Sequence, residues 1–237
     1  MKSLPVFVLV LSSLGSGAFA QTQINLGTAD KFALLGASGI TNVSSLTYVI
    51  GDVGSSPTPA VTGFTEAQVD GHVFLASNPA TTQAQTDLTG AYNQAAAAAC
   101  DTDLTGQDLG GMTLVPGVYC FSSSASLTGT LTLDAQGDTD AQWIFQIGST
   151  LTTASNSDVV LVLGNVQPLW EKALRGCNVY WQVGSSATIG TGSTFLGKIL
   201  ALTSITINGG IFRGKSLASN GAITISTQET VDGPPCK

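Results

Sequence analysis

The sequence has little charge, and most of that charge is acidic. Of its 237 residues only 10% are charged, with 8 Lys and Arg against 15 Asp and Glu, so the formal net charge is -7 at pH 7. A protein that binds nucleic acid or an anionic membrane needs clustered basic residues. We therefore expect neither partner, and we expect an exterior made mostly of Ser, Thr, Asn, Gln and Gly.

Metal-ligating residues are also scarce. His72 is the single histidine, expected in a structural or solvated role, and no two cysteines stand in the CxxC spacing of a zinc site. Asp101, Asp103 and Asp108 lie in a polar loop over residues 100–111. We favour turn and capping roles for these carboxylates over a weak calcium site. No metal and no cofactor is expected.

Residues arranged for catalysis are missing in the same way. Solenoid enzymes that cleave polysaccharides carry clustered acids, or a calcium site with a basic residue, in one groove. Lys198, Arg213 and Lys215 are the only basic residues near the repeats described below, and no pair of carboxylates keeps their register. We therefore do not expect an enzyme.

No apolar run is long enough to span a membrane. The run over residues 4–14 follows a basic start and precedes the small residues Ala18-Phe19-Ala20, a pattern typical of a secretory signal peptide. We expect cleavage before Gln21, which removes residues 1–20 and leaves residues 21–237 as one secreted, extracellular domain.

Four cysteines are an even number, as expected for disulfides in an exported chain. Four cysteines allow three pairings, and the sequence alone does not choose among them. We favour Cys100–Cys120, which closes the polar loop between them, and then Cys177–Cys236. Free buried thiols are the alternative for either pair.

What the sequence does have is an internal repeat. Ser186-Ala187-Thr188-Ile189, Ser204-Ile205-Thr206-Ile207 and Ala222-Ile223-Thr224-Ile225 follow one another at a spacing of 18 residues. A period near twenty in a β-branched, glycine-punctuated sequence is typical of a stacked solenoid, in which each repeat forms one coil. The alternation within each repeat predicts strands whose apolar side chains enter the core and whose threonines point outward.

The same pattern recurs earlier in the chain at wider spacing. We expect further ranks at Ser126-Leu127-Thr128 and Thr150-Leu151-Thr152, and an additional one at Ser38-Gly39-Ile40-Thr41. The threonine spacings of 24 and 36 residues before the regular repeats indicate loop excursions, the longest of them containing residues 166–176. Trp143 and Trp181, among the other aromatic residues, are expected to anchor the core or loops rather than to stack on sugars.

One stretch lacks strand alternation. Residues 81–99 are rich in alanine, the best helix former, and Leu88, Ala91, Tyr92 and Ala95 fall at helical spacing. We expect a single helix that covers one long face of the solenoid and leaves the others free.

A file of threonines on a rigid sheet points to a repetitive, uncharged ligand. Equivalent residues of stacked coils lie about 4.8 Å apart, and threonine is stiff at χ1. Each threonine offers a hydroxyl that holds water and a methyl group that orders the water around it. Ice and crystalline polysaccharide both fit such a surface. A threonine ladder that only stabilises the solenoid is the alternative.

Several segments resemble the β-helical ice-binding proteins of cold-adapted microbes. The resemblance lies in the run from Asn178-Val179-Tyr180-Trp181-Gln182 to Ser204-Ile205-Thr206, in Ile50-Gly51-Asp52-Val53-Gly54, in Pro116-Gly117-Val118-Tyr119 and in Trp143-Ile144-Phe145-Gln146-Ile147. It covers nearly the whole mature chain. The resemblance implies a mainly β chain that forms a discontinuous right-handed β-helix of triangular section, with one long α-helix packed alongside. It also implies that the N-terminal coil stacks near the C-terminal coils, which brings Thr41 into the threonine file.

The resemblance further implies adsorption to ice without catalysis, giving thermal hysteresis and inhibition of recrystallisation. We expect the protein to act as a monomer. The expected ice-binding residues share an outward position on the repeat strands: Thr41, Ser126, Thr128, Thr150, Thr152, Ser186, Thr188, Ser204, Thr206, Ala222 and Thr224. A secreted cell-surface adhesin or polysaccharide-binding solenoid is the alternative. Asn42-Val43-Ser44 is the only N-glycosylation sequon, and we expect it to be unused or edge-facing.

Overall fold

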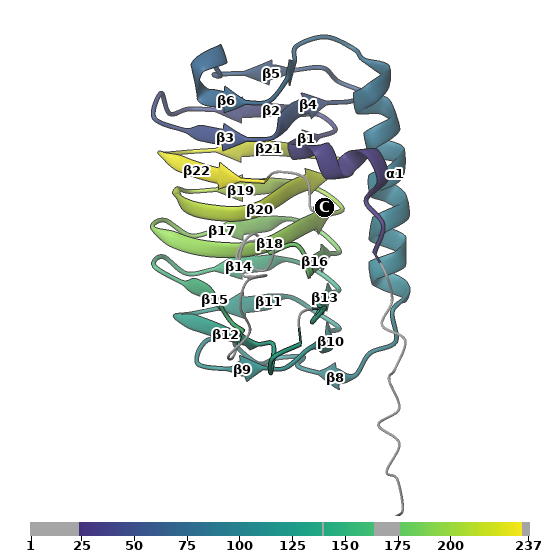
Figure 1. Cartoon of the computed structure of the whole chain (residues 1–237), viewed down its shortest axis with the longest axis vertical. Helices are drawn as coiled ribbons and strands as arrows, with labels where there is room; N and C mark the ends of the chain where they lie inside the picture. The colour runs from purple at the N-terminus through teal and green to yellow at the C-terminus, as the bar shows by residue number, and fades with distance from the viewer. Residues whose placement is uncertain (1–23, 139, 164–175, 234–237) are drawn as a thin grey trace, which may run out of the picture.

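A computed structural model describes residues 24–138, 140–163 and 176–233. The expected signal peptide, Cys236 and the expected excursion over residues 166–176, except Gly176, lie outside the described residues. Figure 1 shows a stack of strands with one long helix beside it. The strands of each coil pair in parallel with those of neighbouring coils, so the predicted β-helix is confirmed.

The coils build three faces. The helix face consists, from the lower end of Figure 1 upward, of β8 (Thr102–Asp103), β10 (Gly117–Phe121), β13 (Trp143–Ile147), β16 (Val179–Val183), parts of β18 (Ser193–Ala201) and β20 (Gly210–Ala218), β1 (Phe32–Gly36), β4 (Asp52–Ser55) and β7 (Val73–Phe74). The second face consists of β9 (Thr113–Leu114), β12 (Thr130–Asp134), β15 (Asp158–Val162), the remaining parts of β18 and β20, β22 (Glu229–Asp232), β3 (Tyr48–Ile50) and β6 (Val69–Asp70).

The third face, which we call the threonine face, is a separate sheet. Its seven strands are, in the same direction, β11 (Ala125–Leu127), β14 (Leu151–Thr153), β17 (Ala187–Ile189), β19 (Ile205–Ile207), β21 (Ala222–Ile225), β2 (Gly39–Asn42) and β5 (Val61–Thr62). The short helices η1 (Gly27–Lys31) and η2 (Glu66–Gln68) precede β1 and β6.

The long strands β18 and β20 turn the corner between the helix face and the second face. The first part of β18 pairs with β15 and its last part with β16. Gly197 and Gly214 sit at this bend with φ of 117° and 153°. A Cβ atom on Gly214 would lie 1.9 Å from the Gly197 carbonyl oxygen, so the two coils approach as closely as they do only because this residue is glycine.

Chain order and spatial order differ along the stack. The N-terminal coil of β1, β2 and β3 pairs with the last coil, of β20, β21 and β22, through Leu34↔Ser216, Thr41↔Thr224 and Val49↔Val231. Helix α1 (Pro79–Ala97) then carries the chain to the lower end, where β8 begins. The prediction that the N-terminal coil stacks on the C-terminal coils is therefore confirmed.

Helix α1 begins and ends on identifiable contacts. The Asn78 side chain accepts a hydrogen bond from the Ala80 amide at 2.8 Å, and Pro79 occupies the first turn. At the other end, Gln146 of β13 donates from Nε2 to the carbonyls of Ala95 and Ala98 at 2.8 and 2.7 Å. These are carbonyls that a helix end otherwise leaves without a partner. The helix thus terminates on the solenoid itself.

A disulfide fixes the same end of the helix. Cys100 and Cys120 are joined, with their Cα atoms 6.0 Å apart, so the segment after α1 is tied to β10. The favoured pairing is therefore present. Cys177 is also disulfide-bonded, while its expected partner, Cys236, lies outside the described residues, so that pairing stays a prediction.

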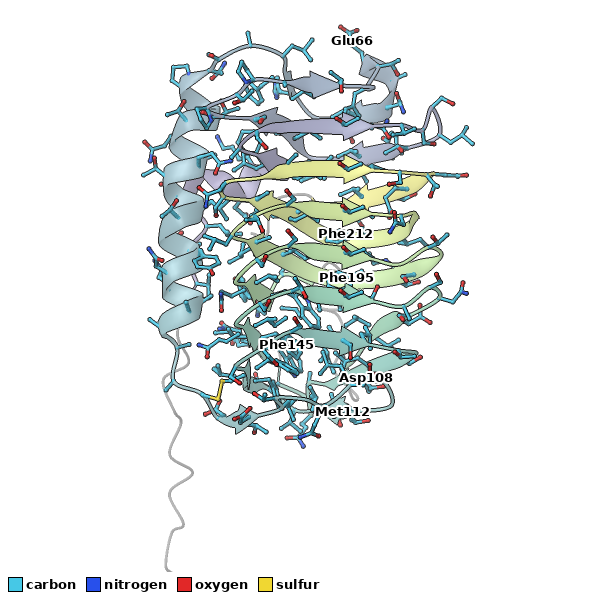
Figure 2. All side chains as sticks on the ribbon, turned by 180° about the vertical axis from the view of Figure 1, so that it is seen from behind. Glu66, Asp108, Met112, Phe145, Phe195 and Phe212 are labelled. Carbon is cyan, nitrogen blue, oxygen red and sulfur yellow. A yellow bond between two sulfur atoms is a disulfide. The ribbon has the colours of Figure 1, made fainter. Side chains whose placement is uncertain are left out.

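The core contains one stack of aromatic rings. Along the axis, ring centroids are separated by 5.6 Å for Tyr119–Phe145, 3.9 Å for Phe145–Trp181, 5.1 Å for Trp181–Phe195 and 5.2 Å for Phe195–Phe212; Figure 2 labels three of these rings. The indole N–H of Trp181 donates to the Leu196 carbonyl at 3.0 Å, as a buried tryptophan requires. Trp181 and Trp143 are both buried, as core anchors should be.

The basic residues near the coils have structural roles. Lys215 Nζ donates to the carbonyls of Asp30 and Gly233 at 2.6 and 2.7 Å. Lys198 Nζ lies 3.6 Å from Asp30 Oδ1 and 4.9 Å from the centre of the Tyr180 ring. Burial lowers the pKa of Lys215 to about 8. These contacts hold η1 against the helix face.

Glu229 is a carboxylic acid inside the corner between β21 and β22. It is 1% exposed, and within the described residues no donor lies in hydrogen-bonding geometry with either of its oxygens. Burial raises the pKa of Glu229 to about 8, and the nearby amides of Thr230 and Phe212 offset this only in part. The folded protein therefore keeps this side chain neutral at pH 7.

We predict that Glu229→Gln stabilises the protein at pH 8 but not near pH 4.5. The pKa of Glu229 is about 8 in the folded state, against 4.5 without burial. The folded state therefore binds a proton that the unfolded state releases, and the free energy of unfolding falls as pH rises through this window, by at most about 1.4 kcal/mol per pH unit. Glutamine has no such proton.

Urea unfolding of both proteins at pH 4.5 and pH 8 measures this difference. The other titrating groups, including Lys215, are present in both proteins and cancel in the comparison. If Glu229→Gln changes the free energy of unfolding by the same amount at both pH values, Glu229 does not have a raised pKa in the folded protein.

Candidate functional site

The outward residues of the threonine face align in one column, which we call the central column. Strand pairing places equivalent residues of successive coils opposite one another. From the lower end upward, the column consists of Ser126, Thr152, Thr188, Thr206, Thr224, Thr41 and Thr62. With strands about 4.8 Å apart, its six steps extend over ~29 Å.

The inward residues fix this register. Ile205 and Ile207 lie on either side of Thr206 and are completely buried, as are Ile223 and Ile225 around Thr224. A shift of one residue would send these isoleucines to the surface and the threonines into the core, so the register is strongly specified. The burial of the core thus determines which residues form the column.

One predicted rank is wrong by two residues. We expected Ser126-Leu127-Thr128 to align with Thr150-Leu151-Thr152, whereas the structure pairs Ser126 with Thr152. The rank at Thr150-Leu151-Thr152 is in register, since Thr152 pairs with Thr188. The error lies in β11, where the outward position opposite Thr152 is held by Ser126 and not by a threonine. Thr128 stands two residues further along the same alternation, so the pattern selected Thr128 instead.

A second column, the flanking column, stands two residues before the central one. From the lower end upward it consists of Ser124, Thr150, Ser186, Ser204, Ala222 and Gly39. Its hydroxyls bond to neighbouring coils: Thr150 Oγ1 donates to Ser124 Oγ at 2.8 Å, and Ser186 Oγ accepts from the Ser204 amide at 3.3 Å. At the upper end the column continues in Ala222 and Gly39, which carry no hydroxyl.

Thr128 belongs to a third column, on the other side of the central one. Backbone hydrogen bonds continue the ladder there, with the amides of Ala154, Asn208, Ser226 and Val43 donating to the coil below at 2.9–3.0 Å. The distal column, as we call it, therefore consists of Thr128, Ala154, Gly190, Asn208, Ser226 and Val43. Its side chains have no common chemistry, so the three columns together are regular only at their centre.

The central hydroxyls are available to solvent. Among the described residues, none forms a hydrogen bond with the side chains of Thr152, Thr188, Thr206 or Thr224, whereas flanking hydroxyls are used within the protein. No residue of the central column carries a charge. The centre of the face is thus a rigid, uncharged array of hydroxyl and methyl groups.

The sequence pattern identified most residues of the central and flanking columns but missed Thr62 of the central column and Ser124 of the flanking column. Ala60-Val61-Thr62 repeats the small-apolar-threonine pattern, but it stands alone in a stretch without other strand signals. Ser124 lies two residues before Ser126, and the error in that rank concealed it. A search for single matches to the repeat would have found Thr62.

Asn42 is an inward residue of β2. It is 5% exposed, and its Nδ2 donates to the carbonyls of Ser44 and Gly63, both at 2.8 Å. Its Oδ1 accepts from Thr47 Oγ1 at 2.9 Å. An attached glycan would need this buried amide, so the folded protein supports the expectation that the sequon is unused.

The carboxylates of residues 100–111 serve as acceptors for turns, as favoured from the sequence. Asp101 Oδ2 accepts from the Val118 amide and Asp103 Oδ1 from the Thr105 amide, both at 2.8 Å. This segment is not entirely a loop, because it contains β8. His72 is largely exposed and lies 3.3 Å from Asp52 Oδ1. Over the described ranges, no group of His, Cys, Asp and Glu is placed to hold a metal ion.

Within the part of the chain that the structure describes, no helix combines the length and the apolar character that crossing a membrane requires.

The family model for ice-binding-like proteins matches residues 34–231. An ice-binding protein of Nostoc sp. (strain HG1) is 48% identical over 224 residues, which cover 94% of this chain and 79% of that protein.

Solved structures agree over the whole fold. An ice-binding protein from an Antarctic biological consortium is 36% identical and superposes with a TM-score of 0.75, covering 97% of this chain and 95% of that one. An ice-binding protein from an Arctic yeast, whose structure is described as the basis of its antifreeze activity, is 30% identical with a TM-score of 0.76 and covers 89% and 95%. The family match, the close relative and the shared solenoid together show that this chain belongs to the ice-binding-like family.

Proposed function

We propose that this protein binds ice through the threonine face and thereby restrains ice growth. The observation that carries the proposal is the central column, in which Thr152, Thr188, Thr206 and Thr224 repeat on successive coils with hydroxyls that form no hydrogen bond within the described protein. The names of its relatives, which are ice-binding proteins, support the same function.

The mechanism is adsorption without chemistry. Each threonine places one methyl group and one hydroxyl at a fixed position, because χ1 is restricted and the backbone is held in a sheet. Water ordered on such an array already has a regular spacing, so little further entropy is lost when it joins a lattice; immobilising an ordered water costs at most about 2 kcal/mol. Many weak contacts on one rigid body then act together, as in multivalent binding.

Adsorbed molecules divide the ice front into segments that bulge between them. The curved front grows only at a lower temperature, which gives a gap between melting and growth. Boundaries between crystals are held in the same way, so recrystallisation is inhibited. A monomer is sufficient for this mechanism, because one face of one chain carries the whole column.

We also propose that the protein works outside the cell. The N-terminal pattern of residues 1–20 is that of a secretory signal peptide. The Cys100–Cys120 disulfide fits an oxidising compartment. Ice that threatens a cell forms first in the surrounding water, where an exported protein meets it.

We predict that Thr188→Tyr and Thr206→Tyr each abolish thermal hysteresis without unfolding the protein. Both threonines are partly exposed and central on the face. A bulky ring at either position therefore keeps the ice lattice away from the neighbouring ranks, while the packing of the core is unchanged. The measurement is the gap between melting and growth temperatures of a single ice crystal, together with a circular dichroism melt.

Thr230→Tyr is the matched control. Thr230 lies on β22 of the second face with a similar partial exposure, paired with Ile211 and Tyr48. This variant should retain full hysteresis. Undiminished activity in both Thr188→Tyr and Thr206→Tyr would refute the threonine face as the ice-binding surface.

We predict that the exported protein begins at Gln21. Expression of the full chain in a bacterium with a general secretory pathway, followed by intact-mass measurement of the extracytoplasmic fraction, should give the mass of residues 21–237. A variant that carries both Ala18→Arg and Ala20→Arg lacks the small side chains that the cleavage site needs. This variant should keep the N-terminal segment. Recovery of uncleaved wild-type protein only in the cytoplasm would contradict export.

A further inference from the structure

We infer that Asp108 sets the lower limit of the ice-contacting area, so that contact begins at Thr152 rather than at Ser126. This inference rests on the proposed function and concerns its extent. It assigns a role to a carboxylate for which the sequence favoured a turn or capping role.

Asp108 stands in register below the central column. It forms a parallel bridge with Ser126, and the Leu109 amide donates to the Ser126 carbonyl at 2.9 Å. Asp108 therefore takes the position that a threonine would hold if the column had one more rank. Figure 2 shows Asp108 near the lower end of the stack and Glu66 at the opposite end.

The Asp108 carboxylate binds the hydroxyls of the lowest rank. Ser126 Oγ donates to Oδ2 at 2.6 Å and Thr128 Oγ1 donates to the same oxygen at 3.1 Å. Oδ1 accepts from the amides of Thr128 and Gly110 at 2.9 and 2.8 Å. Each hydroxyl has a single proton, so Ser126 and Thr128 can only accept hydrogen bonds from water. From Thr152 to Thr224 the hydroxyls keep both functions.

The charge itself opposes contact with ice. A carboxylate is strongly hydrated, and removing its water costs several kcal/mol unless a cation replaces it; the ice lattice offers no such cation. Burial acts to raise the pKa of Asp108, but its hydrogen bonds from Ser126, Gly110 and Thr128 outweigh burial, so this pKa is lowered. The group therefore stays ionised at neutral pH and retains liquid-like water beside the lowest rank.

The upper end of the column lacks this feature. β5 is the last strand of the sheet among the residues that the structure describes, and none of these residues pairs beyond Thr62. Thr62 Oγ1 has only long contacts, at 3.5 Å, to the Ile40 carbonyl and Thr41 Oγ1. Glu66 belongs to η2 and not to the column. The two ends of the face thus differ, and only the lower one ends on a charge held against the last hydroxyls.

The direct test is Asp108→Asn. Asparagine has the same shape, and its Oδ1 still accepts from the Gly110 and Thr128 amides, so the turn is kept. Its Nδ2 now donates to Ser126 Oγ, which turns the serine proton toward water, and the negative charge is gone. We expect a larger thermal hysteresis than wild type at equal molar concentration. Asp103→Asn, with the same charge change in a turn of the helix face, is expected to leave hysteresis unchanged.

A second pair of variants locates the limit independently. Thr152→Tyr is expected to keep less than about a tenth of the wild-type hysteresis, and Ser126→Tyr more than about half, because residues outside a contact area contribute little to binding. This comparison decides the matter if circular dichroism shows that Asp108→Asn has not folded.

The outcomes separate the two proposals. If folded Asp108→Asn shows no gain, or if Ser126→Tyr loses as much activity as Thr152→Tyr, while Thr188→Tyr remains inactive, the limit at Asp108 is overturned and the threonine face stands. If Thr188→Tyr and Thr206→Tyr retain activity, the threonine face itself is wrong.

Discussion

The register between parallel coils is the constraint on which the rest of this structure depends. Each regular repeat buries two aliphatic side chains, one on either side of an outward residue; Ile205 and Ile207 lie in this way around Thr206. Because the side-chain period of a strand is two, the burial that stabilises the coil also decides which residue faces water. The binding surface is therefore a consequence of core packing. No local loop or cluster has to be held in place for it, which explains why the proposed site is an extended file and not a pocket.

The discontinuous topology makes this surface depend on both ends of the chain. Thr41 and Thr224 are neighbours in the file although they lie far apart in sequence, because β2 is inserted as the coil after β21. Side-chain amides of both partners, Gln85 on α1 and Gln182 on β16, then hold the helix that makes this return possible against the solenoid. Gln85 Nε2 donates to the Gly36 carbonyl at 2.7 Å, and Gln182 Nε2 to the Tyr92 hydroxyl at 2.8 Å. The N-terminal coil and α1 thus hold the upper ranks of the file in place.

The regular part of the file could be predicted from the sequence, and the irregular part could not, for a physical reason. Where the inward residues are alanine or isoleucine, apolar and hydroxylated residues alternate clearly in the sequence. The ranks of Thr188, Thr206 and Thr224 can therefore be predicted in register. In β11 the outward position is held by Ser126, and Thr128 stands two residues further along the same alternation, so matching on threonine selects a position two residues too far. The role of Asp108 was hidden differently: its distance in sequence from Ser126 gives no sign that the two residues share a bridge. Local pattern specifies strands, whereas partners across coils follow from how the loops between them are closed.

The low charge of the chain can now be related to its structure. A surface that merges with an uncharged lattice gains nothing from ions, because each would have to be desolvated. Accordingly, the central column carries no charge. Lys198 and Lys215 lie beside Asp30 of η1, and Glu229 is held neutral in a corner of the core. Asp108 is the exception, and it lies where the column ends. The positions of the few charges therefore matter more than their number. Charges are absent from the column that must match the ice lattice, and the first charge below the column, that of Asp108, marks where the contact with ice ends.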